Sequence, residues 1–345
     1  MVEAPERIDA PPVTMKPLVS ILIPAFNAEK WIAAAIASAI GQTWERKEIV
    51  VVDDGSTDKT LAVARRFASP NVTIVTQANM GAAAARNKAF ALCRGDYIQW
   101  LDADDLLAPD KIERQVDALS RHPGPRILLS SSWGHFIHRS EKSEFRPTPL
   151  WCDAAPVEWL VKRMEHNRFM SCAVWLVSRE LTESAGPWDT RLSLDDDGEY
   201  VSRVIASSEQ IHFVAEAKAF YRRRAYSLSY VGRSVEKLES QLLSARLQIR
   251  QLRSLEESER VRAACVRYLQ NLLICIYPDR MDLVREAEEL AAELGGRLKT
   301  PQMPLKYAWI QKLFGWTAAK QAALSYNEIK SNILSFWDRM LFRSS

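Results

Sequence analysis

The sequence lacks the patterns of a disulfide-stabilised or zinc-binding protein. It has five cysteines, which is an odd number, and no two of them are spaced as CxxC. Its five histidines form no HxxxH or HExxH spacing. Disulfide frameworks belong to secreted domains, whereas clustered cysteines and histidines indicate zinc sites. We therefore expect a chain that folds in a reducing compartment and binds no zinc.

The sequence also lacks a long hydrophobic run. No stretch reaches the roughly 18 consecutive apolar residues that a membrane span needs, and the N-terminal residues contain no apolar signal-peptide core. A net charge of +3 over 345 residues is too small to indicate nucleic acid binding. We predict a cytoplasmic protein without a nucleic acid partner, attached at most peripherally to the inner face of the membrane.

Strand-like and helix-like segments alternate through the first third of the chain. Continuous apolar runs predict strands at 18–24, 48–52, 72–75 and 97–101. Apolar residues at helical spacing predict helices at 28–40, 57–68 and 81–92, the first with Asn27 as its N-cap. This alternation predicts an α/β fold with a parallel sheet covered on both faces. Residues 127–222 mix strands with short helices and are expected to continue the same sheet.

The chain divides into five predicted segments. These are a disordered tail at 1–17, two halves of an α/β domain at 18–125 and 126–232, a helical extension at 233–300, and amphipathic aromatic and basic helices at 301–345. Residues 235–252 repeat apolar side chains every three or four positions, which predicts packing on the same domain or, alternatively, an oligomer contact. Residues 303–342 interleave aromatics with lysines, which is typical of a helix packed internally or of one in a membrane interface.

Polar clusters follow three of the predicted strands. They are Pro24 to Asn27, Asp53 to Ser56, and Asp102 to Asp105. Ligands of parallel α/β sheets bind at the carboxyl ends of the strands, so these clusters should converge on one crevice. The first strand is followed by no GxGxxG, which argues against dinucleotide binding.

The carboxylates of this crevice suit a nucleotide that is bound through a metal ion. Mg²⁺ and Mn²⁺ take carboxylate and phosphate oxygens, so Asp102 and Asp104 can meet one cation, or a ribose hydroxyl and a cation. Asp54 can accept a hydrogen bond from a uracil imide, and Phe26 offers a face for base stacking. The same short sequences also occur as ordinary turns and caps.

These motifs resemble a family 2 glycosyltransferase with the GT-A fold, a Rossmann-like three-layer sandwich. The resemblance is carried by "VSILIPAFNAEKWIAAAIASAIGQTW" (19–44), "EIVVVDDGSTDKT" (48–60), "NMGAAAARNKA" (79–89) and "GDYIQWLDADD" (95–105). It implies that nucleotide binding involves Pro24, Phe26, Asn27, Asp54, Arg86 and Asp102. It also implies a DxD pair, with Asp104 on Mn²⁺ or Mg²⁺ and Asp102 toward the ribose or the metal.

The resemblance further implies an inverting transfer that needs a general base. The family takes this base from an acidic pair, and the matching stretch is "GPWDTRLSLDDDGEYVSRVI" (186–205). We expect Asp197 to be the base, with Asp196 as the next candidate and Asp195 as a possible N-cap. The alternative interpretation is a solvated acidic turn. Arg222, Arg223 and Arg224 are expected either to neutralise the leaving diphosphate or to form an ordinary exposed basic loop.

The resemblance implies a UDP-sugar donor and an acceptor that is a glycan or lipid-linked. The family's processive members carry QxxRW, which is absent here, so we expect single additions in cell-surface glycan or glycolipid assembly. The alternative is a nucleotide-sugar-binding or scaffold protein with a degenerate GT-A site. A nucleotidyltransferase is disfavoured because no Gly-rich phosphate loop follows the first strand.

Overall fold

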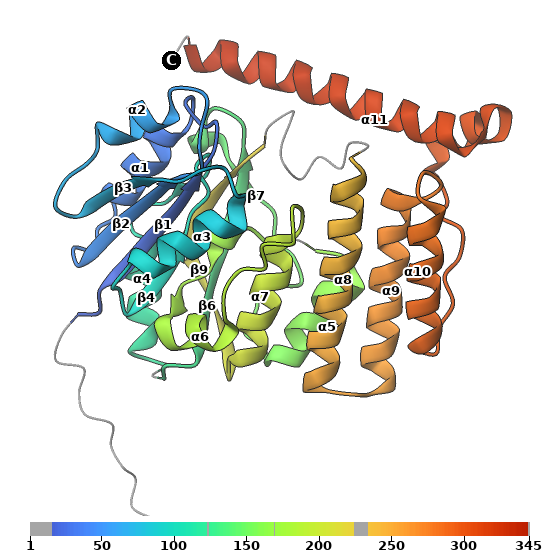
Figure 1. Cartoon of the computed structure of the whole chain (residues 1–345), viewed down its shortest axis with the longest axis horizontal. Coiled ribbons are helices and arrows are strands. Elements are labelled where there is room, and N and C mark those ends of the chain that lie inside the picture. The colour runs from blue at the N-terminus through green and yellow to red at the C-terminus, as the bar shows by residue number, and fades with distance from the viewer. Residues whose placement is uncertain (1–15, 123, 169, 224–233, 344–345) are drawn as a thin grey trace, which may run out of the picture.

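The computed structural model describes residues 16–122, 124–168, 170–223 and 234–343. The first sheet has the strand order β3-β2-β1-β4-β8. Its parallel strands are β1 (Val19–Ala25), β2 (Lys47–Asp53), β3 (Val72–Thr76) and β4 (Tyr97–Trp100), and β8 (Val177–Ser178) runs antiparallel to β4. The predicted α/β fold with a parallel sheet is therefore confirmed (Figure 1).

A helix follows each of the first three strands, as predicted, but two of them are shorter than expected. They are α1 (Ile32–Ile40), α2 (Thr60–Arg65) and α3 (Ala82–Leu92), and α3 packs on β1 and β2. The expectation that Asn27 caps the first helix is wrong. Asn27 has a left-handed φ of 47°, and its Oδ1 accepts a hydrogen bond from Thr57 N at 2.9 Å. Asn27 therefore joins the loop after β1 to the loop after β2.

Residues 127–222 do not continue the first sheet, apart from β8. They form most of a second sheet with the order β5-β9-β6-β7, namely β5 (Leu106–Leu107), β9 (Gln210–Arg222), β6 (Ile127–Phe136) and β7 (Glu144–Phe145). The short β8 occupies the free edge of β4, so the long β6 pairs with β9 over Ile127–Phe136 instead. An isolated bridge between Leu129 and Leu176 links the two sheets.

Short helices alternate with these strands along the chain. They are α4 (Lys111–Leu119), α5 (Pro156–His166), α6 (Arg179–Ala185) and α7 (Asp196–Ser207), with single 3₁₀ turns at Ser140–Lys142 and Cys172–Val174. Of these, α4 packs on β9, and α6 packs on α7. The start of α7 matters most for the site, because it carries the acidic triplet.

The helical extension packs on the α/β domain and shares its core. It consists of α8 (Val235–Leu255), α9 (Glu259–Ile276) and α10 (Met281–Glu293). The helix α8 packs on α7, and α9 packs on α5. The apolar repeat of α8 is buried within the chain at Leu238, Leu242, Ala245, Ile249 and Leu252. This repeat is therefore not free to contact a second copy of the chain.

The C-terminal helix α11 (Leu305–Arg343) runs across one side of the molecule, beyond the carboxyl ends of the strands (Figure 1). It contains a break at Gly315, whose φ is 82°. Its beginning forms a small separate core with Met303, Tyr307 and Ala319. Across the described residues, we find no helix with the length and apolarity required to cross a membrane.

Candidate active site

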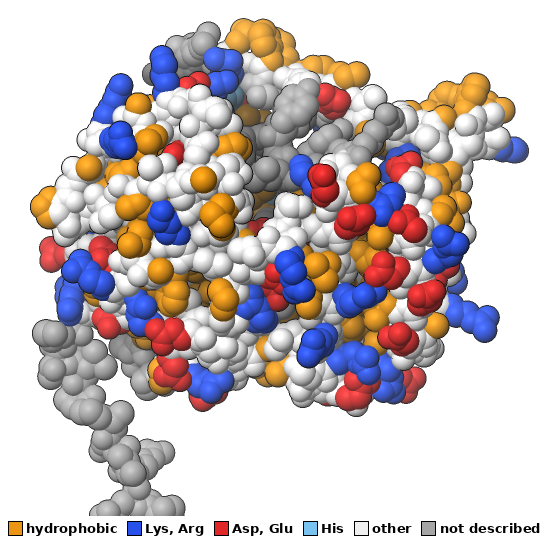
Figure 2. Space-filling model, in the orientation of Figure 1, with side chains coloured by type: hydrophobic (Ala, Val, Ile, Leu, Met, Phe, Trp, Pro, Cys, Tyr) orange, Lys and Arg blue, Asp and Glu red, His pale blue; other side chains and the backbone are white. Residues whose placement is uncertain are grey.

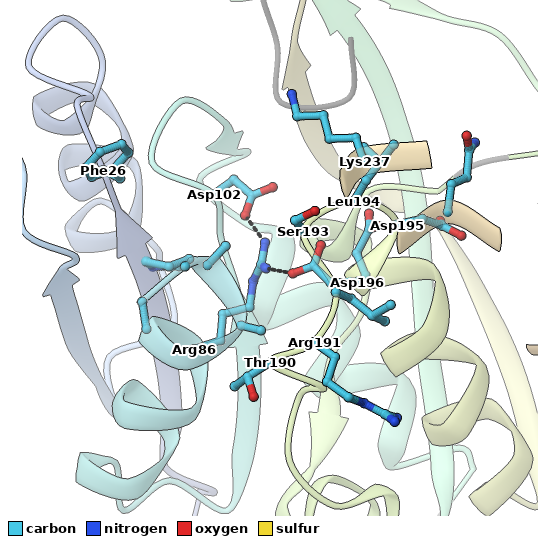
Figure 3. A pocket seen from close by; sticks show the side chains of 18 of the residues that line it. Phe26, Arg86, Asp102, Thr190, Arg191, Ser193, Leu194, Asp195, Asp196 and Lys237 are labelled. Carbon is cyan, nitrogen blue, oxygen red and sulfur yellow. Dashed lines mark hydrogen bonds and ion pairs between the residues drawn. The ribbon is translucent and has the colours of Figure 1, made fainter. Parts of the chain in front are cut away.

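A cavity of about 720 Å³ opens at the carboxyl ends of β1, β2 and β4 (Figure 3). Its walls come from the loops after these strands, the start of α7, and the helices α8 and α9. It is lined by eight residues singled out in the sequence, namely Pro24, Phe26, Asp54, Arg86, Asp102, Asp104, Asp196 and Asp197. The cavity thus brings both halves of the domain to one place.

Arg86 joins the two halves at the centre of this cavity. Its Nη2 lies 2.8 Å from Asp102 Oδ1, and its Nη1 lies 2.7 Å from Asp196 Oδ2 (Figure 3). Its guanidinium stacks 4.3 Å above the ring of Trp188. Burial alone would lower the pKa of Arg86, but the two carboxylates raise this pKa above its ordinary value. Arg86 is therefore a permanent cation between two acidic groups that lie far apart in the sequence.

Asp54 is buried behind the loop that precedes α3. Its Oδ1 accepts hydrogen bonds from Gln77 Nε2 at 2.7 Å and Met80 N at 2.9 Å. Its Oδ2 accepts from Gly81 N at 2.8 Å. A carboxylate offers about four acceptor positions, so one further donor can be taken. Phe26 lines the same cavity and is 46% exposed.

The DxD segment supplies two carboxylates to the cavity and turns a third away. Asp102 and Asp104 line the cavity. Asp105 is buried, and it accepts hydrogen bonds from Arg222 N at 2.8 Å and from Ser171 Oγ at 3.3 Å. Burial raises the pKa of Asp105 well above its usual range, and the charges of Asp104 and Asp102 add to this effect.

Two carboxylates fit a metal whose remaining ligands come from a substrate. Within the described part of the chain, no group of three or more His, Cys, Asp or Glu side chains is placed to hold a metal ion. Mg²⁺ and Mn²⁺ bind through one or two carboxylates together with substrate phosphate oxygens. Asp102 and Asp104 match that donor set, provided that a diphosphate completes it.

The acidic triplet lies across the cavity from the strand ends. Asp195 precedes α7 in a left-handed conformation, with φ 58°, and Asp196 and Asp197 form the first residues of the helix. Burial raises the pKa of Asp197 to about 8, and the neighbouring charges of Asp196 and Asp195 add to the rise. Burial also raises the pKa of Asp196, although Arg86 opposes this shift. A carboxylate with a pKa near neutrality suits a general base.

The arginine triplet after the second sheet does not lie in the cavity as a unit. Arg222 is buried, and it donates from Nε to Asp104 O at 2.8 Å and from Nη1 to Ile137 O at 2.6 Å. Its guanidinium also stacks 4.3 Å from the Trp31 ring. Arg222 thus supports the DxD loop from behind, contrary to both expectations for it. Arg223 is exposed, and Arg224 lies outside the described residues.

Sequence reasoning missed the wall that the helical extension contributes. It is formed by Lys237 and Gln241 from α8 and by Tyr268, Asn271, Leu272 and Cys275 from α9. The local sequence of α8 gave no signal of this wall, because a polar row beside an apolar repeat normally marks the solvent-facing side of an amphipathic helix.

Comparison with known proteins relates the first part of the chain to a known family. Residues 20–148 match the family model for glycosyl transferase family 2. Over 114 residues, 32% of this chain, the sequence is 43% identical to the chondroitin synthase of Escherichia coli, of which it covers 17%. Over 184 residues, 53% of this chain, it is 40% identical to an uncharacterized glycosyltransferase of Rickettsia typhi, of which it covers 57%. The chain therefore spans less than two thirds of each of these relatives.

Solved structures extend the likeness of the fold beyond the matched segment. Residues 1–349 of TarS from S. aureus, in complex with UDP-GlcNAc, superpose with a TM-score of 0.58 at 15% identity, covering 81% of this chain and 92% of that chain. The mannosyltransferase PcManGT from Pyrobaculum calidifontis, in complex with GDP-Man and Mn²⁺, superposes with a TM-score of 0.54 at 18% identity. This match covers 94% of this chain and 88% of that chain. These matches show that the chain has the GT-A fold and that its residues 20–148 are similar to glycosyl transferase family 2.

Proposed function

We propose that this chain is an inverting, metal-dependent glycosyltransferase. It transfers a sugar from a nucleotide diphosphate donor, UDP by preference, to one acceptor hydroxyl, in cell-surface glycan or glycolipid assembly. The observation that supports this proposal is the single cavity that holds Asp102, Asp104 and Asp197 together. One side of the cavity suits the donor diphosphate, and the other presents a carboxylate suited to accept a proton.

The transfer requires one bond to form and one to break at the anomeric carbon. The acceptor oxygen attacks this carbon, and the bond to the diphosphate oxygen breaks, with its electron pair leaving on the nucleotide. The acceptor hydroxyl gives its proton to the carboxylate of Asp197. Asp196 is engaged by Arg86 at 2.7 Å, which makes it the weaker candidate for this role.

Asp102 and Asp104 would hold Mn²⁺ or Mg²⁺ together with the donor diphosphate. When bound there, such a cation would supply positive charge to stabilise the leaving phosphate oxygens. Arg86 lies 2.8 Å from Asp102, and it would hold that carboxylate in place before the donor arrives. The diphosphate role considered for Arg222 is dropped, because its guanidinium is used within the protein.

The nucleotide would lie between Phe26 and Asp54. The exposed ring of Phe26 suits stacking with a base, and the remaining acceptor position of Asp54 suits the imide N–H of uracil. TarS has been solved with UDP-GlcNAc, whereas PcManGT has been solved with GDP-Man. Uracil is favoured here because its single imide N–H matches the one acceptor position left on Asp54, whereas guanine would present two N–H donors, from N1 and from its 2-amino group.

The acceptor would occupy the wall formed by the helical extension. Gln241 lines this wall, and its Oε1 is buried without a hydrogen-bond partner among the described residues. Buried polar atoms normally have partners, so this oxygen suits a hydroxyl of a bound sugar. Lys237 lines the same wall and adds a positive charge.

Calorimetric titration of UDP, with and without Mn²⁺, tests the donor site. We expect metal-dependent binding in the wild type and in Asp197→Ala, and its loss in Asp104→Ala. A panel of UDP- and GDP-sugars then identifies the preferred nucleotide. If no nucleotide binds under any condition, the enzyme proposal fails, and a scaffold with a degenerate site becomes the better interpretation.

We propose that α11 contacts a membrane as part of this function. Its exposed face carries an apolar row at spacings of three and four, formed by Tyr326, Ile329, Ile333, Phe336 and Met340, with Trp337 beside it. These side chains are roughly half exposed or more, and apolar side chains line the edge of the molecule where α11 runs (Figure 2). Burial against this chain, the other interpretation of the segment, is therefore wrong for this row.

An anionic lipid surface fits this row better than a second copy of the chain. On the opposite face, Asp338 ties α11 to the domain, with Oδ1 2.8 Å from Arg139 Nε and Oδ2 accepting from His138 N. The exposed charges beside the row are the cations Lys330 and Arg339. Aromatics with flanking cations are typical of helices that lie in a membrane interface.

Sedimentation with vesicles of phosphatidylglycerol and phosphatidylcholine tests this contact. Ile333→Asp places a charge on the row, whereas Asn332→Asp adds the same charge at the adjacent exposed position. We expect the first variant to lose most binding and the second to keep most of it. Equal binding by both variants, or none by the wild type, would contradict the membrane role.

A further inference from the structure

The helix α8 carries a row of buried polar side chains. Ser240, Ser244 and Gln248 lie four residues apart, so they share one face of the helix. Their exposed fractions are 4%, 0% and 1%. Buried polar groups cost stability unless they are hydrogen-bonded. The hydrogen-bond partners of these three side chains therefore indicate the role of the row.

Ser240 binds the backbone that leads to the acidic triplet. Its Oγ accepts hydrogen bonds from Ser193 N and Leu194 N, both at 2.9 Å. The same Oγ donates to Leu194 O at 2.9 Å. A hydroxyl has one donor and two acceptor positions, so its capacity is fully used on this short segment.

Ser244 and Gln248 hold the next residue, Asp195. The Oγ of Ser244 lies 2.8 Å from both the backbone O and Oδ2 of Asp195. The Nε2 of Gln248 donates to the same Oδ2 at 2.7 Å. Arg163 donates to Gln248 Oε1 and lies 3.9 Å from Asp195 Oδ1, so the amide is fixed from its other side. Tyr268 of α9 adds a longer contact to Oδ2, at 3.4 Å.

This arrangement fixes where α7 begins. Asp195 is the N-cap residue of α7, yet its side chain makes no cap hydrogen bond to the helix. It is turned to α8 instead. A Cβ added at Gly198 would overlap Asp195 Oδ1 and lie 2.7 Å from Arg163 Nη2, so this position next to the Asp195 side chain requires glycine. The two residues after Asp195 are those that reach Arg86 and the cavity.

We propose that Ser240, Ser244 and Gln248 are positioning residues for transfer. They hold residues 193–195 so that Asp197 faces the acceptor and Asp196 meets Arg86. The helical extension, which lies outside the segment matched by the family model, is then part of the catalytic apparatus. This inference rests on the proposed function, because it assigns the row to the proton-accepting side of that site.

A merely structural row would affect stability and leave turnover intact. The test compares the double variant Ser244→Ala/Gln248→Leu with Leu252→Ala, which removes a buried side chain from the same helix beyond the row. We expect the double variant to lower kcat about 10- to 100-fold, with the donor KM nearly unchanged, because small misplacements of reacting groups are costly. Leu252→Ala should lower Tm and leave kcat unchanged well below Tm. Ser244→Thr keeps the hydroxyl and should retain most activity.

A second measurement works without any enzymatic activity. Hydrogen exchange of the segment 192–200 should accelerate at least about tenfold in Ser240→Ala, because two amides lose their acceptor, while α9 keeps its protection. Unchanged kcat in the double variant, or unchanged exchange in Ser240→Ala, would overturn the positioning role. If the wild type binds no nucleotide, the proposed function fails instead, and the exchange result still decides whether the row holds this segment.

Discussion

The parallel sheet and the helical extension supply facing walls of one cavity by different means (Figure 3). The sheet places carboxylates through topology, because parallel strands end at a common edge. The extension acts through side chains, because α8 holds the acidic triplet by hydrogen bonds from Ser244 and Gln248. The strand-end carboxylates can be recognised in the local sequence. The hydrogen bonds from α8 to the acidic triplet form only when α8 packs on α7.

The largest effect is expected from removing Arg86, which links the sheet to the acidic triplet that the extension holds. Arg86→Met leaves Asp102 and Asp196 without their shared cation. Removing one partner of a buried ion pair typically costs about 3–5 kcal/mol. We expect the free energy of unfolding to fall by that amount in urea titrations. Arg146→Met, which breaks an exposed pair with Glu144, should cost no more than about 1 kcal/mol. A similar small loss in both variants would contradict the importance of the link.

The pH dependence of turnover sharpens the comparison, because it reports on the proton-accepting side of the cavity. Asp197 must be ionised to accept a proton, and its pKa is about 8. The rate should therefore rise about tenfold per pH unit up to that region and level off above it. Below this pKa, and above the ordinary one, the Asp197 carboxyl stays protonated in the folded chain, whereas in the unfolded chain it has already lost its proton. The resulting contribution to stability is present in full below the ordinary pKa of 3.8 and is lost progressively as the pH rises to about 8. A rate that is flat between pH 6 and 9 would contradict this assignment.

Much of the sheet, but less of the site, could be predicted from the sequence. Strands β1 to β4 follow from continuous apolar runs, and the positions of Asp54, Asp102 and Asp104 follow from those strand ends. The second sheet was mistaken for a continuation of the first, because the local pattern does not reveal that β8 occupies the edge of β4.

Long-range contacts explain the other differences. Arg86 and Asp196 are separated by 110 positions, so nothing in either local sequence indicates their contact. Arg222 stands in a run of basic residues that is typical of an exposed loop, but it is buried between Trp31 and Phe136. Its burial depends on carbonyl groups of Asp104 and Ile137, which no sequence pattern specifies.

The smallest effect is expected at the nucleotide end of the sheet. Phe26→Ala removes an exposed ring without disturbing the core. Offset stacking contributes about 0.5–1.5 kcal/mol, so the affinity for UDP should fall between about 2- and 13-fold. Ile40→Ala removes an exposed apolar side chain at the end of α1, outside the cavity, and should leave the affinity unchanged in the same calorimetric titration. Unaltered binding by Phe26→Ala would remove Phe26 from the site.

The most direct test of the central claim is donor consumption by wild type and Asp197→Asn under saturating UDP-sugar and Mn²⁺. If the sheet binds the donor and Asp197 accepts the proton, the variant should bind UDP as tightly as the wild type. Its rate should fall by about 10²–10⁴-fold, the usual contribution of general base catalysis. A variant that binds UDP and keeps the wild-type rate would contradict the account.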